Sequence, residues 1–154
     1  MSLMRLMLTV QKATRAPGMP RTSSITQWAR AALGGSGSGR ATVTVRLVDE
    51  AESAALNKRY RGKKGPTNVL SFSYDTLRGA AGLNGDLVIC APLVAREAAQ
   101  QNKLLRAHWA HLVVHGILHL RGYDHVQEKD AQIMEALEVR VLKRLGFPDP
   151  YFRP

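Results

Sequence analysis

The chain has 154 residues, a length that favours a single domain over residues 1–154. Lys and Arg total 22 against 12 Asp and Glu, so the formal net charge is +10, which favours a polyanionic partner. The sequence has no apolar run near the roughly 20 residues of a transmembrane helix and no secretory-signal pattern at its start. Its one cysteine, Cys90, excludes an internal disulfide and is typical of a reducing compartment. We therefore expect a cytoplasmic protein without a membrane partner.

The first half of the chain is predicted to form two strands and two helices. Apolar residues alternate in the strands and recur at helical spacing in the first helix. Thr22, Ser23 and Ser24 offer N-caps to that helix. Residues 34–39 are only glycine and serine, which predicts a flexible loop. The predicted elements are strands over 6–10 and 42–48 and helices over 22–33 and 49–60.

The second half is predicted to form two more strands and three helices. Pro92 suits the first turn of a helix, and Gly122 suits the end of the longest one. The predicted elements are strands over 69–73 and 86–90 and helices over 92–102, 104–120 and 127–145. The last helix is expected to bury Ile133, Met134, Leu137, Val141 and Leu142. About four strands and five helices indicate a single α/β or α+β domain.

Three of the five histidines stand in the segment VHGILHLRGYDH at 114–125. His115 and His119 are four residues apart on a predicted helix, so their side chains share one face, with Cβ atoms about 5–6 Å apart. Gly122 lets the chain turn back, and His125 then offers a third ligand from the loop. Three protein ligands leave a fourth position for water, as in catalytic zinc sites, whereas structural zinc sites usually have four ligands. The sequence therefore predicts one zinc ion per chain, bound by these three histidines.

Two further histidines precede this trio on the same predicted helix. At about 100° per residue, His108 and His111 fall on nearly the same face as His115 and His119. We interpret each of them as an ordinary polar helix residue. The alternative for His111 is that it orients a metal ligand or contacts the substrate.

The same histidine spacing is the ligand pattern of the metzincin proteases. Those enzymes need a glutamate directly after the first histidine as general base, and Gly116 occupies that position here. The pattern therefore keeps the metal ligands but removes the protease's base, which disfavours proteolysis. Activation of water by the metal remains available, because zinc lowers the pKa of bound water to about 7.

A cluster of cations precedes the predicted strand at 69–73. Five cations occupy seven positions, namely Lys58, Arg59, Arg61, Lys63 and Lys64. Such a run is usually a solvated surface. Beside a metal-binding helix it is also suited to grip phosphates, since the arginine fork donates two hydrogen bonds to phosphate oxygens. A guanidinium fixed beside a metal suits phosphodiester cleavage, in which negative charge grows on the phosphoryl oxygens.

Three stretches of the chain resemble the YbeY family of bacterial endoribonucleases that mature ribosomal RNA. They are LNKRYRGKKGPTNVLSF at 56–72, LNGDLVIC at 83–90 and HWAHLVVHGILHLRGYDH at 108–125. The likeness runs over nearly the whole chain, including the closing MEALE and LGFPDPY. It implies an α+β fold in which a mixed four-stranded sheet packs against about five helices, with the metal-binding helix in the centre.

The resemblance also implies a function and a set of site residues. It implies a zinc-dependent, single-strand-specific endoribonuclease acting in maturation of the 16S rRNA 3′ end and in ribosome quality control, with the small ribosomal subunit as partner. The family's zinc-binding histidines fall on His115, His119 and His125. Its functionally important arginine falls on Arg61, which we predict to be catalytic. The remaining cations of the cluster are predicted to contact RNA: Lys58, Arg59, Lys63 and Lys64.

The chain departs from the family pattern at Lys64, where an acid is usual. If that acid orients Arg61, this chain must orient Arg61 differently or work more slowly. If it only caps the turn, Lys64 adds affinity for RNA. The helix after the third histidine is also less acidic than usual in the family. Two other functions are alternatives. The first is a zinc-stabilised assembly factor that binds the ribosome or rRNA with little nuclease activity, which the basic surface supports equally. The second is a metalloprotease, which Gly116 disfavours.

Overall fold

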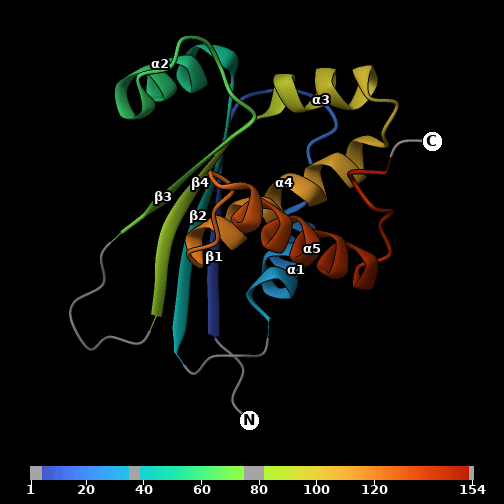
Figure 1. The fold of residues 1–154 in the computed structure, drawn as a ribbon. Coiled ribbons are helices and arrows are strands. Elements are labelled where there is room, and N and C mark those ends of the chain that lie inside the picture. Colours follow the sequence, from blue (N-terminus) through green and yellow to red (C-terminus); the bar gives the residue numbers. More distant parts are fainter. Residues whose placement is uncertain (1–4, 35–38, 75–81, 153–154) are drawn as a thin grey trace.

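Strands and helices follow one another along the chain in the computed structural model, which describes residues 5–34, 39–74 and 82–152 (Figure 1). In chain order the elements are β1 (Arg5–Ala13), α1 (Thr22–Leu33), β2 (Arg40–Val48), α2 (Glu50–Arg61), β3 (Val69–Ser73), β4 (Gly82–Cys90), α3 (Ala91–Gln100), α4 (Leu105–Leu120) and α5 (Glu128–Arg144). Every predicted strand and helix is present. The loop predicted at 34–39 lies, over residues 35–38, outside the described residues.

The four strands form a mixed sheet in the order β1-β2-β4-β3, which confirms the expected α+β architecture. β1, β2 and β4 run parallel, and β3 pairs antiparallel with β4. Side chains of β4 alternate between the two faces. Leu87 and Ile89 join the main core, whereas Val88 and Cys90 join a smaller cluster on the opposite face. The free thiol of Cys90 is buried there.

Helix α4 lies at the centre of the domain, between the sheet and α5 (Figure 1). It contacts α1, α3, α5, β3 and β4, and most of its residues are buried. The helix approaches the sheet closely at Gly116, where an added Cβ atom would lie 2.7 Å from Cδ2 of Leu87. The apolar residues of α4 thus fix the position of the histidines that the same helix carries.

Two local predictions were wrong. The N-cap position of α1 is Arg21, without a side-chain cap, because Thr22 is already the first helical residue. Ile133 is 48% exposed rather than buried, whereas Met134 and Leu142 are buried as expected. The buried stripe of α5 runs instead through Glu138, so Ile133 is turned toward solvent.

In the described part of the chain, no helix is long and apolar enough to cross a membrane.

Candidate metal centre

His115, His119 and His125 converge where α4 ends. The ring centroids are 4.6 Å apart for His115 and His119, 4.9 Å for His119 and His125, and 5.4 Å for His115 and His125. α4 presents the first two on one face, and Gly122, with φ of 101°, turns the chain so that His125 returns to them. Only glycine takes such a backbone conformation without a steric cost. The structure therefore brings together the three residues that the sequence predicted as ligands.

The trio has the donor chemistry of a metal site. One nitrogen from each ring lies within 4.8 Å of the other two, so the group can hold a metal ion. Burial and the neighbouring imidazoles of His115 and His125 lower the pKa of His119 to about 4. Its ring is therefore neutral at pH 7 and keeps a lone pair for a metal.

A buried carboxylate lies directly behind the trio. Glu138 of α5 has only 1% of its side chain exposed. Its Oε1 accepts hydrogen bonds from Nε2 of His111 at 2.5 Å and Nδ1 of His115 at 3.2 Å. The Tyr151 hydroxyl donates to both carboxylate oxygens, at 2.9 and 3.0 Å. Burial raises the pKa of Glu138, but the hydrogen bonds from His111 and His115 outweigh it, and the pKa falls to about 2.

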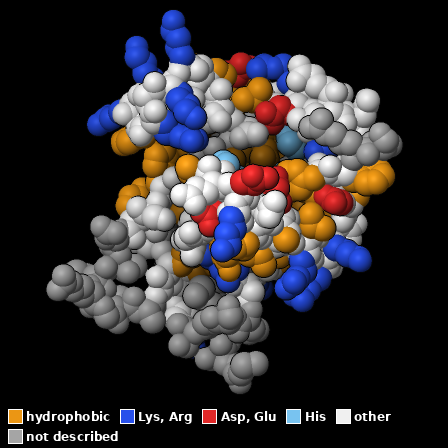
Figure 2. All heavy atoms as spheres, viewed as in Figure 1, with side chains coloured by type: hydrophobic (Ala, Val, Ile, Leu, Met, Phe, Trp, Pro, Cys, Tyr) orange, Lys and Arg blue, Asp and Glu red, His pale blue; other side chains and the backbone are white. Residues whose placement is uncertain are grey.

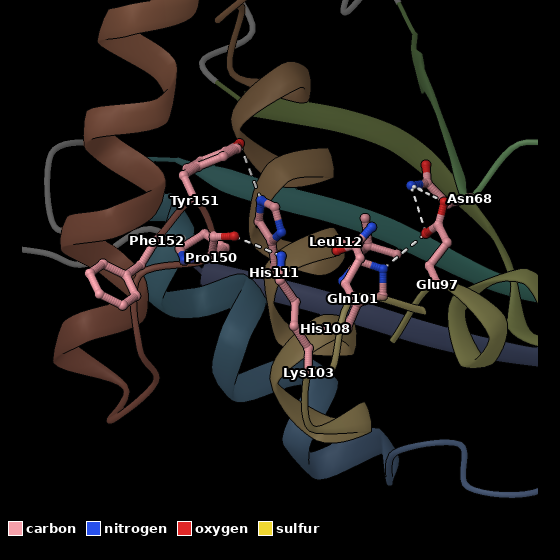
Figure 3. A pocket seen from close by; sticks show the side chains of 10 residues that line it. All are labelled: Asn68, Glu97, Gln101, Lys103, His108, His111, Leu112, Pro150, Tyr151 and Phe152. Atoms are coloured by element: carbon pink, nitrogen blue, oxygen red, sulfur yellow. Dashed lines mark hydrogen bonds and ion pairs between the residues drawn. The ribbon is translucent and has the colours of Figure 1, made fainter. Parts of the chain in front are cut away.

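His108 belongs to a second buried network on the same helix. Its Nε2 donates to Oε1 of Glu97 at 2.9 Å, and Nδ2 of Asn68 donates to both oxygens of that carboxylate. Figure 3 shows this network and His111 on the walls of one cavity, with a volume of about 580 Å³. His108 and His111 are thus each held by a glutamate inside the domain, which corrects their interpretation as ordinary polar helix residues.

A cavity of about 550 Å³ lies in front of the trio. All three histidines line it, together with Arg61, which is exposed at the last turn of α2. Gly62 follows in the left-handed conformation, with φ of 67°, and ends the helix there. One cavity is therefore lined by both the candidate metal ligands and an arginine.

Helix α2 is held to the domain mainly by polar contacts. Its buried residues are Ser53 and Asn57. The Ser53 hydroxyl donates to the Thr67 carbonyl at 2.9 Å, and Asn57 donates to the Gly65 carbonyl at 2.9 Å. Leu56 adds an apolar contact to the smaller cluster of the sheet. These contacts fix the turn between α2 and β3 and so place Arg61 at the edge of the cavity.

The other predicted RNA-contacting cations lie outside this cavity. All four are exposed on α2 and the turn after it: Lys58, Arg59, Lys63 and Lys64. None of them is among the residues that line the cavity in the described part of the chain. Figure 2 shows Lys and Arg side chains gathered over α2, next to the depression where histidine is visible. The structure thus separates Arg61 from the rest of the cationic cluster.

The comparison with known proteins assigns the family. The family model described as Endoribonuclease YbeY matches residues 14–146. The chain belongs to the YbeY family of endoribonucleases. A protein named Endoribonuclease YbeY from Methylococcus capsulatus is 53% identical over 94% of both chains. One of the same name from Aromatoleum aromaticum is 54% identical over 96% of this chain and 93% of its own.

A solved structure adds evidence on the fold. The solution structure of a Thermotoga maritima protein aligns with 96% of this chain and 100% of its own, with a TM-score of 0.50 and 22% identity. This similarity shows a shared fold. It agrees with the α+β architecture that the sequence of this YbeY-family chain predicted.

Three polar residues near the histidine trio of this YbeY-family chain were not predicted from the sequence. Glu138 stands four residues after Met134 and four before Leu142, so it lies within the apolar stripe of α5. A single acid in such a stripe is a signal of a buried partner. Tyr151 gave no such signal, because it reaches Glu138 from the segment after α5. Asp124 lines the metal cavity and stands directly before His125.

Proposed function

We propose that this chain is a zinc-dependent, single-strand-specific endoribonuclease of the cytoplasm that acts in maturation of the 16S rRNA 3′ end and in ribosome quality control. The observation that carries this proposal is that the histidine trio and Arg61 line one surface cavity. A metal site that shares a cavity with a guanidinium suits a phosphodiester, whose charge increases during cleavage. Membership of the YbeY family supports RNA as the substrate.

His115, His119 and His125 would hold one zinc ion. Three neutral imidazoles are a usual zinc donor set and leave a coordination position for water. When bound, zinc supplies a Lewis acid for a phosphoryl oxygen and lowers the pKa of water. The trio positions this chemistry at the cavity that Arg61 also lines.

Arg61 would hold the phosphate that is cleaved. Its guanidinium is always charged and presents paired N–H donors that match two phosphoryl oxygens. These donors strengthen their hydrogen bonds as negative charge grows on the phosphoryl oxygens, which stabilises the transition state. The exposed cations around it would contact neighbouring phosphates along the RNA, and their contribution falls as salt rises. These residues are Lys58, Arg59, Lys63 and Lys64.

Asp124 would be the general base. Among the described residues that line the metal cavity, it provides the one carboxylate. Its Oδ1 accepts a hydrogen bond from the backbone N–H of His125 at 2.7 Å, which fixes the side chain beside the third ligand. A carboxylate in this place can take a proton from an attacking water. Glu138 is unsuited to that role because it is buried behind His115.

Two aromatic rings on the cavity wall support a preference for single strands. Tyr60 and Phe72 pack edge to face, with centroids 5.2 Å apart, and both line the cavity. Unpaired bases stack on exposed aromatic rings, whereas bases in a duplex are already stacked on each other. A single strand can therefore contact both these rings and the cations of α2.

The experiment that tests the function combines metal analysis with RNA cleavage. Purified wild-type protein is expected to contain one zinc ion per chain and to cleave single-stranded RNA faster than duplex RNA of the same sequence. His119→Ala is expected to lose both zinc and cleavage, and chelator-treated wild type is expected to regain cleavage when zinc is returned. Full cleavage by metal-free His119→Ala would contradict the proposal.

The exposed cations outside the cavity also favour a second candidate, a zinc-stabilised assembly factor that binds the ribosome. That function predicts ribosome association and normal rRNA processing in an Arg61→Ala variant. The proposed nuclease predicts that the same variant associates with the ribosome but leaves precursor rRNA uncleaved. Measurement of 16S precursor in cells that carry only this variant separates the two.

A further inference from the structure

We propose that Glu138 is a positioning residue for the metal centre, which it acts on through His115. This inference rests on the proposed zinc site and assigns a role to a residue that lines neither of the two cavities described above. Glu138 contacts a single member of the trio, at Nδ1 of His115. It would fix both the direction of that ring and the nitrogen that faces the metal.

The first step of the argument is the tautomer of His115. An ionised carboxylate only accepts hydrogen bonds, so Nδ1 of His115 must carry a proton to contact it. In a neutral imidazole the other nitrogen, Nε2, is then unprotonated. Nε2 is therefore left with its lone pair for a metal, which is the state that a ligand requires.

The second step concerns the direction of the ring. His115 is four residues from His119 on α4, and an unrestrained histidine side chain can rotate about two bonds. The carboxylate on the far side of the ring holds it in one orientation, toward His119 and His125. Carboxylate partners of metal-bound histidines commonly act in this way, and their loss weakens metal binding or activity roughly 10–100-fold.

The third step explains why the carboxylate is itself fixed. A buried charge is costly unless every part of it is paired. His111 and Tyr151 both donate to Glu138, from α4 and from the segment after α5. These donors stabilise the charge and hold the carboxylate against His115. His111 thereby acts on the metal centre indirectly, through Glu138, without being one of the three proposed metal ligands.

The position of Glu138 in α5 supports a functional rather than a structural role. Its neighbours on the buried stripe are Met134, Val141 and Leu142. A hydrophobic residue of similar size at such a position is commonly as stabilising as a buried ion pair or more so. Retention of a charge there is explained if the charge orients His115.

Glu97 provides a matched control for the experiment. It is the other glutamate that pairs with a histidine of α4, but its partner, His108, is not a member of the trio. Zinc dissociation constants are measured at pH 7 by competition with a chromophoric chelator for wild type, Glu138→Ala and Glu97→Ala. We expect affinity to fall roughly 10–100-fold in Glu138→Ala and to stay at the wild-type value in Glu97→Ala.

The visible spectrum of cobalt-substituted protein provides a second readout, because it reports the ligand geometry directly. It should shift in Glu138→Ala and stay unchanged in Glu97→Ala. If Glu138→Ala does not fold, Glu138→Gln replaces it: the amide oxygen can still accept from His115 but carries no charge, so affinity should fall by less. Wild-type affinity in the folded Glu138 variant, or an equal loss in Glu97→Ala, would overturn the proposal.

The same measurements separate this inference from the proposed function. Wild-type protein that binds zinc but cleaves no RNA would contradict the nuclease and leave the role of Glu138 intact. Wild-type protein that needs zinc for cleavage, with unchanged zinc affinity in Glu138→Ala, would contradict only the role of Glu138.

Discussion

Replacement of Gly116 by alanine tests how closely α4 must approach the sheet. The new Cβ atom would lie 2.7 Å from Cδ2, 3.0 Å from Cδ1 and 3.3 Å from Cγ of Leu87. Carbon atoms in good contact lie about 3.5–4.0 Å apart, and Leu87 is fully buried, so neither it nor the helix can move freely. Overpacking of this kind costs about 1–3 kcal/mol, and the better helix propensity of alanine offsets about 1 kcal/mol. We expect a net loss of about 0–2 kcal/mol in the free energy of unfolding.

The assay is urea unfolding of Gly116→Ala alone and in a Leu87→Ala background. Leu87→Ala removes all three contacting atoms and itself costs about 2–5 kcal/mol, within the stability of a typical domain. In that background Gly116→Ala should become neutral or stabilising by about 1 kcal/mol. Equal effects of Gly116→Ala in both backgrounds would refute the reasoning, because the two residues would then not be coupled.

Three further predictions concern the cavity and the network behind it. Arg61→Ala should keep zinc but lose roughly 10²–10³-fold in cleavage rate. Lys64→Ala should only weaken RNA binding and reduce the salt dependence of that binding. Equal losses of cleavage rate in the two variants would show that Arg61 has no special role. Asp124→Asn should lower the cleavage rate roughly 10²–10⁴-fold at unchanged zinc content, and normal single-turnover rates would exclude Asp124 as the base. Burial raises the pKa of Glu97, but hydrogen bonds from His108 and Asn68 bring it below its usual value. The stability that this carboxylate contributes is therefore complete at neutral pH and lost as pH falls through the lowered pKa. Glu97→Gln is expected to lower the free energy of unfolding by about 1–3 kcal/mol at pH 7, and this loss should become smaller in acid. A loss that stays constant with pH would show that the ionised Glu97 carboxylate does not stabilise the fold.

The sequence was sufficient to predict that the three histidines converge because their geometry is local. His115 and His119 share a face through helix periodicity alone, and Gly122 marks the turn that returns His125. The strands and helices were likewise predictable from apolar periodicity. The N-cap of α1 was not, because Thr22 is already helical. The burial of Ile133 was not either, since it depends on which face of α5 meets α4.

The residues around the trio needed the structure because their contacts are distant in sequence. Glu138 and Tyr151 meet His115 only after α5 packs on α4. Five cations lie together along the chain, but only the fold shows that Arg61 alone among them lines the described metal cavity. Sequence adjacency cannot tell which residue of such a cluster lines a cavity.

The meaning of Gly116 also changed once the structure was known. In the sequence it marked the absence of a protease's general base. In the structure, a side chain at this position would point at Leu87 of β4. A glutamate there would collide with the core instead of serving the cavity. The glycine is therefore explained by helix–sheet packing, and the lack of a protease base follows from it.

The two walls of the metal cavity belong to parts of the domain that differ in local stability. The α4 wall can open only when the main core unfolds, because its apolar residues are part of that core. The α2 wall is held by two buried polar side chains, by Leu56 and by the partly exposed ion pairs Arg46–Glu52 and Arg96–Glu50, so we expect it to detach at a lower free energy. Amide hydrogens of α2 should therefore exchange with solvent through local fluctuations that leave α4 protected. Displacement of α2 would then move Arg61 while the histidines remain in place.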